Sequence, residues 1–335
     1  MRAAVTAEGG FEVVDVDDPR PAPGELLLRV AANGICGSDV STAPLLPPGI
    51  IMGHEFAGEV IGHGNGADHD QWPAGTPVAV MPVAGCGHCR ACAVGDIARC
   101  ASAQTLGLGL GAGALAEFVC VPAGSCVRLD TLAPAGAEVD LVGAAITEPL
   151  AVGLHAVSAA RVAPGDRVLV IGAGPVGLAV LHWLSRSTAS TVVCSDKAAP
   201  RRTAAADNGA TTSLDPADVP SGAFDVVIEC AGKPGVIAAA IDAAAPLGTV
   251  VVAGVCLSAD SFLPVAGVVK ELTLRFVSYY TRAEFEAAAR AVVTGSVASD
   301  AFVSERAGLD SVGRVIAELG SPGDQRKVLI VPGRG

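Results

Sequence analysis

Four cysteines in one short stretch are the clearest candidates for chemistry. Cys86, Cys89, Cys92 and Cys100 form the pattern C-x2-C-x2-C-x7-C. A tetrahedral Zn2+ takes four thiolates, and two-residue spacings let a chain wrap around a single ion. Four thiolates leave no open position for a substrate, so the pattern predicts a structural zinc. An iron–sulfur cluster is the alternative, although Ala101 stands where the bacterial cluster pattern carries proline.

A second set of metal-binding side chains is spread over three short motifs. Cys36 opens the motif C-G-S-D, His54 and Glu55 belong to G-H-E, and Glu148 belongs to T-E-P-L. An isolated cysteine is usually a packing residue, and an isolated His-Glu pair usually lies at the surface. Together the motifs supply sulfur, nitrogen and oxygen ligands for a zinc ion that keeps one position open. The combination predicts a catalytic metal site.

A glycine-rich turn follows an apolar run later in the chain. The GxGxxG pattern consists of Gly172, Ala173, Gly174, Pro175, Val176 and Gly177. The first glycine permits a tight turn, the second lets the backbone approach a pyrophosphate, and the third permits close packing of helix on strand. The diphosphate would then lie against free N–H groups at the helix N-terminus. The motif predicts a dinucleotide-binding site.

An acidic residue stands at the distance that such a site requires. Asp196 follows the next apolar run, 24 residues after Gly172, and an acid there accepts hydrogen bonds from the adenosine ribose and repels a 2′-phosphate. We therefore expect NAD(H). Lys197, Arg201 and Arg202 follow closely and favour NADP(H), because a cation can receive that phosphate. We expect Lys197 and Arg201 to line the cofactor site together with Asp196.

The periodicity of apolar residues predicts two kinds of domain around these motifs. Residues 26–31, 58–61, 77–81 and 116–121 are short β-type runs between turns, typical of a mostly antiparallel, barrel-like domain. From about residue 147, apolar runs alternate with alanine-rich helical stretches, as in a doubly wound parallel sheet. The expected strands there are 167–171, 191–195, 225–230 and 249–253, and the expected helices are 176–186, 201–208 and 237–244.

The C-terminal part of the chain should return to the first domain. Beyond residue 278 we expect two helices, the second with Val312, Val315, Ile316 and Leu319 on one apolar stripe. Asp310 is the expected N-cap of that helix, and residues 327–331 should form a last strand. The expected fold is thus α/β, with a catalytic domain at 1–151, a Rossmann domain at 152–284 and the C-terminal return at 285–335.

Composition excludes several classes of function. The 335 residues carry a formal charge of -12, which repels phosphate backbones and argues against nucleic acid as a partner. Residues 168–184 lack a formal charge, but they are short for a membrane span and contain the glycine-rich turn. The first 18 residues lack the apolar core of a signal peptide. We therefore expect a cytoplasmic protein whose ten cysteines serve metal binding or packing rather than disulfides.

The order of these motifs resembles that of the zinc-containing medium-chain dehydrogenases, in particular the polyol and threonine dehydrogenase branches. The resemblance runs over nearly the whole chain and implies a GroES-like catalytic domain beside the Rossmann domain. By this resemblance Cys36 and His54 bind the catalytic zinc, Glu55 is a further or exchanging ligand, and Glu148 ligates zinc directly or through water. The four clustered cysteines match the structural-zinc cysteines of the family one for one.

The resemblance also implies a reaction. Zinc lowers the pKa of the alcohol, and a hydride passes from the carbinol carbon to the nicotinamide. Asp39 matches a residue that braces the zinc-binding histidine. Ser38 matches the hydroxyl that takes the alcohol proton, although it could equally be a turn-capping serine. Relatives form dimers or tetramers, and the apolar segments 249–253 and 272–277 are candidate sheet edges for such an interface.

The sequence departs from the family pattern in two places. Ser41 stands where several relatives carry a histidine that relays the proton to solvent. Only seventeen residues separate Cys36 from His54, and segment 40–51 is short, apolar and rich in proline. Because the corresponding loop helps to roof the substrate pocket in relatives, we expect a wider pocket or a bulkier, less polar substrate.

The sequence therefore predicts an NAD(H)-dependent, two-zinc dehydrogenase of a secondary alcohol or the matching ketone. The alternatives are an NADPH-dependent carbonyl reductase of the same fold and a catalytically silent dinucleotide-binding protein. The intact Cys36, His54 and Glu148 argue against the silent protein, because a non-catalyst has no use for an open metal site.

Overall fold

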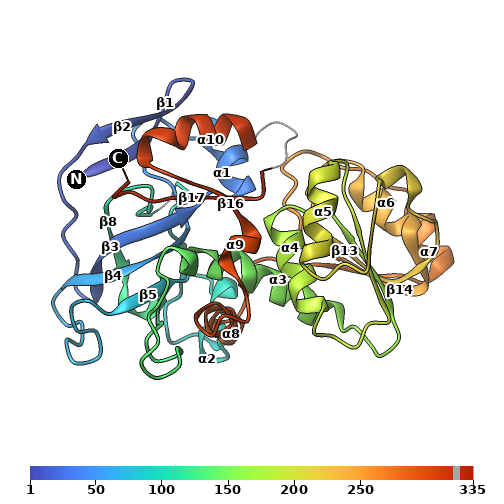
Figure 1. The fold of residues 1–335 in the computed structure, drawn as a ribbon, viewed down its shortest axis with the longest axis horizontal. Helices are drawn as coiled ribbons and strands as arrows, with labels where there is room; N and C mark the ends of the chain where they lie inside the picture. The colour runs from blue at the N-terminus through green and yellow to red at the C-terminus, as the bar shows by residue number, and fades with distance from the viewer. Residues whose placement is uncertain (110, 320–324, 335) are drawn as a thin grey trace. The chain divides into compact units, whose positions relative to one another are not determined.

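The computed structural model describes residues 1–109, 111–319 and 325–334. The chain divides into two compact units, the first made of Met1–Glu148 with Thr281–Gly335 and the second of Pro149–Tyr280. No helix among the described residues is long and apolar enough to cross a membrane. In the first unit, the C-terminal segment lies among strands from the start of the chain (Figure 1).

The first unit is built on a mostly antiparallel sheet, as the turn-rich sequence predicts. Its strands follow the order β16-β17-β3-β4-β5-β9, and β8 also pairs with β3. They comprise β3 (Glu25–Gly34), β4 (Glu55–His63), β5 (Pro77–Val80), β8 (Phe118–Pro122), β9 (Cys126–Arg128), β16 (Val303–Ala307) and β17 (Lys327–Ile330). Leu26, Leu28 and Val30 alternate along β3 and are buried in one apolar cluster, which is the period of two that a half-buried strand requires.

Smaller elements surround this sheet. A hairpin joins β1 (Arg2–Ala7) and β2 (Gly10–Asp15), and a second short pair joins β6 (Val83–Ala84) and β7 (Gln104–Thr105). The helices are α1 (Gly37–Thr42), α2 (Arg90–Ala93), α8 (Arg282–Val293), α9 (Ser299–Phe302) and α10 (Val312–Leu319). The 3-10 turns are η1 (Ala43–Leu45), η2 (Ile97–Arg99), η3 (Ala123–Ser125), η4 (Gly143–Ile146) and η6 (Leu309–Ser311).

The expected N-cap of the last helix is wrong. Val312 and Val315 are buried and Ile316 and Leu319 pack against the same cluster, so the apolar stripe is as expected. A 3-10 turn precedes α10, however, and Gly308 occupies its N-cap position. Asp310 therefore lies inside the turn, and its carboxylate pairs with Arg2 of the N-terminal hairpin at 2.8 Å.

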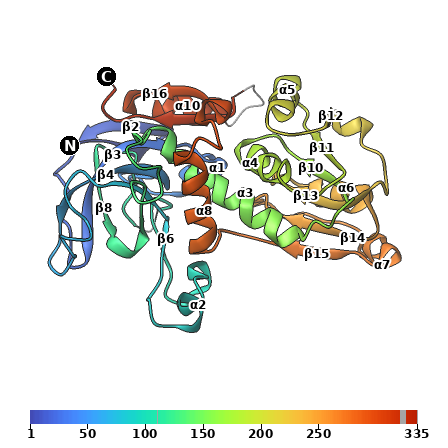
Figure 2. The same ribbon diagram turned by 60° about the horizontal axis from the view of Figure 1, so that its bottom comes forward.

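The second unit is a doubly wound parallel sheet, as expected. Six strands follow the order β12-β11-β10-β13-β14-β15, and every pair is parallel. The strands are β10 (Arg167–Ile171), β11 (Thr191–Ser195), β12 (Thr212–Leu214), β13 (Phe224–Glu229), β14 (Ala244–Val252) and β15 (Thr273–Phe276). The helices α3 (Thr147–Ala160), α4 (Pro175–Leu184), α5 (Ala199–Asp207), α6 (Val236–Ala243) and α7 (Pro264–Lys270) and the turn η5 (Pro216–Asp218) complete it (Figure 2).

Two features of this sheet matter for function. The strand order reverses between β10 and β13, and dinucleotides bind at the carboxyl ends of the strands beside such a switch point. The expectation that segment 249–253 forms a sheet edge is wrong, because residues 249–252 belong to β14, which pairs with β13 on one side and β15 on the other. β15 alone is the edge strand on that side.

Candidate functional site

The ligand atoms of Cys36, His54 and Glu55 all lie within 4.8 Å of one another. The sheet brings them together: Cys36 follows the end of β3 as the N-cap of α1, and Glu55 is the first residue of β4. Gly34 pairs with Glu55 across these two strands, and a Cβ on Gly34 would lie only 2.3 Å from Glu55 Oε2. Glycine is therefore required where the carboxylate turns toward the other two side chains.

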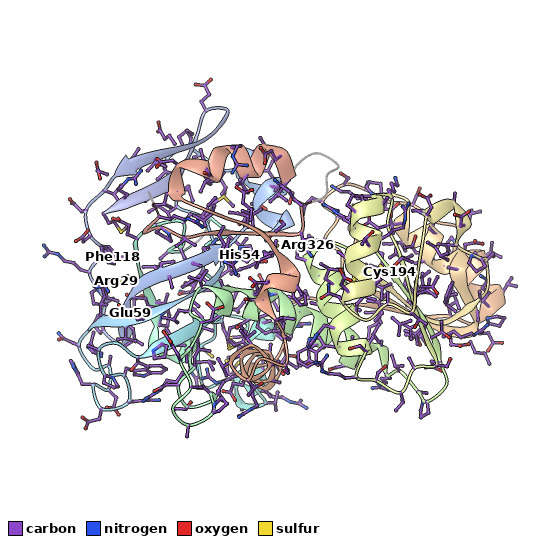
Figure 3. The ribbon with its side chains drawn as sticks, in the orientation of Figure 1. Arg29, His54, Glu59, Phe118, Cys194 and Arg326 are labelled. Atoms are coloured by element: carbon purple, nitrogen blue, oxygen red, sulfur yellow. The ribbon has the colours of Figure 1, made fainter. Side chains whose placement is uncertain are left out.

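His54 is oriented by a buried carboxylate. Its Nδ1 lies 3.2 Å from Oδ1 of Asp39, which has no exposed surface, and Asp39 Oδ2 also accepts a hydrogen bond from the N–H of Cys36 at 2.8 Å. Burial lowers the pKa of His54, but Asp39 and Cys36 raise it by more, so that this pKa stands well above its usual value. Asp39 thus holds both the imidazole ring of His54 and the backbone of Cys36. Figure 3 labels His54 in the first unit.

The two serines near this cluster differ in their surroundings. Ser38 Oγ lies 3.4 Å from His54 Nε2, so its hydroxyl is beside the candidate metal ligands. Ser41 is exposed and donates to the carbonyl oxygens of Gly37 and Ser38 at 3.1 and 3.2 Å. A hydroxyl used in this way bonds back to the preceding turn of its own helix, and Ser41 supplies no basic group.

Glu55 has a partner that sequence reasoning missed. Lys327, the first residue of β17, donates to Glu55 Oε2 and also to the carbonyl oxygen of Ile35 at 2.9 Å. Both charged side chains are almost completely buried. Burial lowers the pKa of Lys327, but Glu55, Cys36 and Glu148 raise it by more. The sequence signal that could have indicated this partner is the lysine at the start of the otherwise apolar strand K-V-L-I.

Glu148 lies outside the group of three ligand atoms. It is buried in the first turn of α3, and the preceding turn η4 packs against β3 and β4. Its negative charge reaches Lys327, whose pKa it helps to raise. The structure thus brings Cys36, His54 and Glu55 together within ligand distance and leaves Glu148 as a neighbouring charge.

The four clustered cysteines converge on one point. Their sulfur atoms all lie within 4.8 Å of one another, and those of Cys89 and Cys92 are 3.6 Å apart. A tetrahedral Zn2+ with Zn–S bonds of about 2.3 Å places its sulfurs roughly 3.8 Å apart. A cluster whose cysteines bind separate irons would hold them further apart. The geometry therefore fits one ion.

Backbone N–H groups favour thiolates in this lobe. Hydrogen bonds from the N–H groups of His88 and Cys89 lower the pKa of Cys86 to about 6. The N–H of Gly87 lowers the pKa of Cys92, but burial and the neighbouring cysteines raise it to about 11. Four thiolates this close repel one another unless a cation lies between them, and such a donor set suits a divalent metal.

The glycine-rich turn has the geometry that its sequence requires. It joins β10 to α4, and Gly174 is the N-cap without a side-chain bond to the first N–H groups of the helix. Gly172 has a φ of +98°, which favours glycine. A Cβ on Gly177 would lie 1.8 Å from the carbonyl oxygen of Gly172, so the third glycine allows helix and strand to approach.

Asp196 lies beside this turn. It follows β11, and its Oδ2 accepts a hydrogen bond from the N–H of Ala173 at 2.8 Å, within the GxGxxG segment. Its Oδ1 accepts from the N–H of Ala198 at 2.8 Å. Arg202 donates to the carbonyl oxygens of Asp196 and Lys197, while Lys197 itself is exposed and Arg201 half-buried. The expected cofactor residues therefore share one edge of the sheet.

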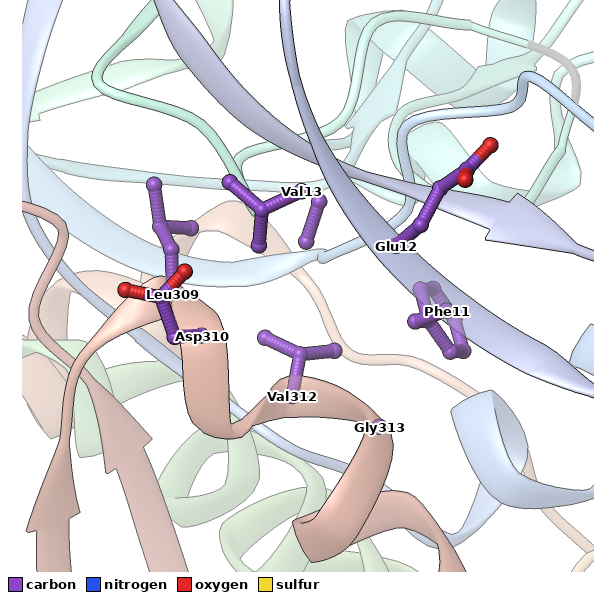
Figure 4. A pocket seen from close by; sticks show the side chains of 8 residues that line it. Phe11, Glu12, Val13, Leu309, Asp310, Val312 and Gly313 are labelled. Atoms are coloured by element: carbon purple, nitrogen blue, oxygen red, sulfur yellow. The ribbon is translucent and has the colours of Figure 1, made fainter.

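A separate small cavity of about 200 Å³ lies between the N-terminal hairpin and α10. Figure 4 shows Phe11, Glu12 and Val13 facing Leu309, Asp310, Val312 and Gly313 across it. Ligand pockets usually enclose about 300–1,000 Å³. This cavity holds none of the candidate metal-binding, catalytic or cofactor-binding residues named from the sequence, and we assign it no function.

Comparison with known proteins agrees with this arrangement. Residues 22–131 match the family model of the alcohol dehydrogenase GroES-like domain, and residues 175–294 match that of the zinc-binding dehydrogenases. The chain is 32% identical over 265 residues to L-threonine 3-dehydrogenase of Pyrococcus furiosus, covering 74% of this chain and 73% of that protein. It is 36% identical over 224 residues to scyllo-inosose 3-dehydrogenase of Thermotoga maritima, covering 61% of this chain but only 56% of that protein.

A solved structure extends the likeness to the whole chain. A zinc-binding dehydrogenase of Sinorhizobium meliloti bound to NADP superimposes with a TM-score of 0.87 at 30% identity, covering 99% of both chains. The matched segments contain both metal-ligand sets up to residue 131 and most of the dinucleotide-binding half. The chain belongs to the zinc-containing medium-chain dehydrogenase/reductase family.

Proposed function

We propose that this protein is an NAD(H)-dependent, two-zinc dehydrogenase that interconverts secondary alcohols and ketones. The observation that carries the proposal is the convergence of Cys36, His54 and Glu55 within 4.8 Å. A thiolate, an imidazole and a carboxylate form a mixed donor set that suits zinc and leaves room for a substrate. Burying ionisable side chains costs free energy. A catalytically silent binding protein would have no use for such a buried set of metal ligands.

The chain's own residues would each have a defined part. Cys36 and His54 would hold the catalytic zinc, with Glu55 as a further or exchanging ligand and Glu148 as a nearby acid. A zinc ion held there lowers the pKa of an alcohol hydroxyl and polarises the matching carbonyl, while NAD(H) exchanges the hydride. Ser38, whose hydroxyl is 3.4 Å from His54 Nε2, would receive the proton of the alcohol.

Proton release to solvent would not use a side-chain relay at position 41. The hydroxyl of Ser41 donates to two carbonyl oxygens of its own turn. A serine hydroxyl also does not gain or lose a proton near neutral pH as an imidazole does. Because Ser41 is exposed, water can reach this turn. We infer that water, rather than an imidazole, carries the proton away from Ser38.

The cofactor preference rests on Asp196. Its carboxylate is held beside the glycine-rich turn by two backbone N–H groups, where a ribose would meet an acceptor and a 2′-phosphate would meet a negative charge. Use of NADPH is the second candidate. The exposed Lys197 and the NADP bound to the Sinorhizobium meliloti relative favour it. The GxGxxG turn serves either cofactor equally, because it contacts only the shared diphosphate.

The second zinc would be structural. The four sulfur atoms of the cysteine lobe lie at the spacing of one tetrahedral ion, and four protein ligands leave no position for a substrate. The lobe also contacts the start of α8, where the N–H of Arg282 donates to the carbonyl oxygen of Gly95. A bound ion would therefore fix the loop on which that helix rests.

The substrate class follows from the short segment between Cys36 and His54. A Cβ added to Gly109 would lie 2.6 Å from Leu46 Cδ2, and a Cβ added to Gly107 would lie 3.0 Å from the backbone nitrogen of His54. Leu46 of this short segment thus lies against Gly109, and Gly107 of the same glycine-rich loop lies against His54. We infer a wide, apolar pocket, which favours bulky or cyclic secondary alcohols over small polyols.

We also infer that the protein is a homodimer formed through the second unit. β15 is an edge strand, and large exposed apolar residues gather on it and on the adjacent α7 and loops. They are Val255, Leu257, Phe262, Leu263, Val265, Val268, Val269 and Phe276. An exposed apolar edge of this kind marks an interface or an aggregation site, and pairing of two β15 strands around a two-fold axis would close both edges.

One experiment tests the enzymatic proposal directly. Purified, zinc-loaded protein is assayed with NAD(H) and NADP(H) separately against a panel from small diols to bulky cyclic alcohols and ketones, with a chelator-treated control. Turnover with NAD(H) that the chelator abolishes is expected. Turnover that survives removal of all metal would contradict the zinc mechanism. No turnover from protein that retains both zinc ions and binds cofactor would favour the silent-binder alternative.

A further inference from the structure

Glu229 carries a buried carboxylate that the proposed reaction does not use. It is the last residue of β13 and lies opposite Ile171, the last residue of β10. These are the two strands between which the strand order reverses, so Glu229 stands at the edge where a dinucleotide binds. Its side chain is only 1% exposed. A charge so deeply buried is costly unless neighbouring groups compensate it.

The compensation comes from the backbone. Glu229 Oε1 accepts hydrogen bonds from the N–H groups of Ala231 and Gly232, both at 2.7 Å. Two successive N–H groups that point at one oxygen form an anion-binding nest, and the φ of +59° at Gly232 supplies the required turn. No lysine or arginine in the described part of the chain forms an ion pair with this carboxylate. Glu229 therefore fixes the loop that follows its own strand.

The same residue holds a second loop. The carbonyl oxygen of Glu229 accepts from the N–H groups of Ala253 and Gly254 at 2.8 and 3.0 Å, directly after β14. A Cβ on Gly254 would lie 2.5 Å from Glu229 Oε2, so the backbone of this loop lies against the carboxylate. The loops after β13 and β14 thus meet at one residue, the first through its side chain and the second through its main-chain carbonyl.

The first of these loops lies against the dinucleotide motif. A Cβ on Gly172 would be 3.1 Å from the nitrogen of Ala231, and the N–H of Cys230 donates to the carbonyl oxygen of Ile171 at 2.8 Å. Gly172 opens the GxGxxG turn. A shift of loop 230–232 would therefore move, or release, the turn that receives the diphosphate.

We propose that Glu229 is a positioning residue of the dinucleotide site, an inference that rests on the proposed cofactor binding. Its side chain holds loop 230–232, and its main-chain carbonyl holds the start of loop 253–255, in the conformation that leaves the edge of the sheet pre-formed for the cofactor. Binding then needs no ordering of these loops, and pre-organisation of this kind raises affinity. The carboxylate acts through the backbone and does not touch the reacting atoms.

The test compares three variants of the zinc-loaded protein. Glu229→Ala removes both carboxylate oxygens but keeps the main-chain carbonyl. Glu229→Gln keeps one side-chain acceptor oxygen, and Asp225→Asn changes an acid that pairs with Arg167 near the opposite end of the same strand. Dissociation constants for NAD(H) are measured by titration, together with KM and kcat. The Ala variant should bind NAD(H) about tenfold more weakly, with kcat at saturating cofactor much less affected. The Gln and Asn variants should remain within about threefold of the wild type.

Hydrogen exchange separates this inference from the function on which it rests. In the Ala variant, the amides of Ala231 and Gly232 should exchange faster, because they lose the carboxylate. Those of Ala253 and Gly254, which donate to the main-chain carbonyl, should change less, and those of the cysteine lobe should stay unchanged. A folded Ala variant with unaltered exchange and unaltered cofactor affinity would overturn the positioning role, as would a Gln variant as weak as the Ala variant. A wild-type protein that binds no nicotinamide cofactor would overturn the proposed function and the inference together.

Discussion

Lys327 and Glu55 form a buried ion pair between residues that are 272 positions apart in the sequence. The lysine opens β17 and the glutamate opens β4, one residue after His54. A Cβ on Gly34 would collide with Glu55 Oε2, at 2.3 Å, and would lie tightly against Lys327 Cδ, at 3.2 Å. The pair therefore places a positive charge from the end of the chain directly behind the candidate metal ligands.

Replacing Lys327 should destabilise the protein strongly. Lys327→Met leaves the Glu55 carboxylate buried without its cation, which costs about 3–5 kcal/mol in comparable sites. The free energy of unfolding is measured by denaturant titration with metal content fixed. The double variant Lys327→Met, Glu55→Gln is the control, because it removes both charges and should recover a large part of the loss. Equal stability of the single variant and the wild type would show that the pair contributes nothing.

The ion pair between Lys327 and Glu55 should also control whether the Glu55 carboxylate can bind a metal ion. A carboxylate released from Lys327 is free to approach the ion, and this would close the position that a substrate needs. We expect Lys327→Met to bind Co2+ with an altered visible spectrum and to lose turnover, and Glu55→Gln to change that spectrum in a different way, because it removes a proposed ligand. An unchanged Co2+ spectrum in the lysine variant would exclude this control of Glu55.

Ser38 and Ser41 should differ sharply in their effects on turnover. Ser38 Oγ lies 3.4 Å from His54 Nε2, so Ser38→Ala removes the group that receives the alcohol proton. Loss of such a group lowers kcat roughly 10²–10⁴-fold. Ser41→Ala is the matched control, since it removes a hydroxyl that bonds back to the preceding turn of its own helix. This substitution should change kcat by less than about threefold. Equal effects of the two substitutions on kcat would show that the Ser38 hydroxyl, like that of Ser41, has only a structural role.

The local motifs were predictable from the sequence because their chemistry depends on near neighbours. The spacing of the four cysteines and the glycines of the GxGxxG turn each constrain a few consecutive residues. Their ligand atoms and backbone dihedrals agree with what those spacings require. The alternation of Leu26, Leu28 and Val30 likewise requires only that β3 has one buried face.

Features that depend on strand register were not predictable. Nothing local to Lys327 indicates that β17 pairs with β3 and so lies near Glu55. Asp310 is a good N-cap by type, but tertiary packing brings Arg2 close and a 3-10 turn shifts the helix start. The apolar run 249–253 fits either an edge or an interior strand, and only the position of β15 decides.

Asp196 should decide between the two cofactors. Asp196→Gly removes the negative charge that opposes a 2′-phosphate and leaves Lys197 and Arg201 nearby. The ratio of kcat/KM for NADP(H) to that for NAD(H) should rise at least about tenfold. Asp215→Asn is the control, because Asp215 also contacts Arg202 without lying beside the glycine-rich turn. A wild type that already prefers NADP(H) would contradict the proposed NAD(H) preference.

The cysteine lobe should support stability without taking part in the reaction. Cys89→Ser removes one ligand and should release one zinc ion per chain and lower the melting temperature, because a structural zinc contributes directly to folding. Cys256→Ser is the control, since that cysteine lies outside the lobe and its Sγ donates to the carbonyl oxygen of Ser258. Metal analysis and thermal unfolding distinguish the two. Iron and sulfide in the wild-type protein would instead identify a cluster.

The apolar edge of the second unit should determine the oligomeric state. Phe276 belongs to β15 and is 63% exposed, and Phe276→Asp places a charge in the centre of the inferred interface. Burial of an unpaired charge there costs several kcal/mol per subunit pair, so sedimentation should show a monomer or a dimer that dissociates at least about a hundredfold more readily. Val94→Asp is the control: Val94 is 70% exposed, but it lies on the cysteine lobe. If the Phe276 and Val94 variants sediment alike, or if the wild type is a monomer, the dimer does not form through β15.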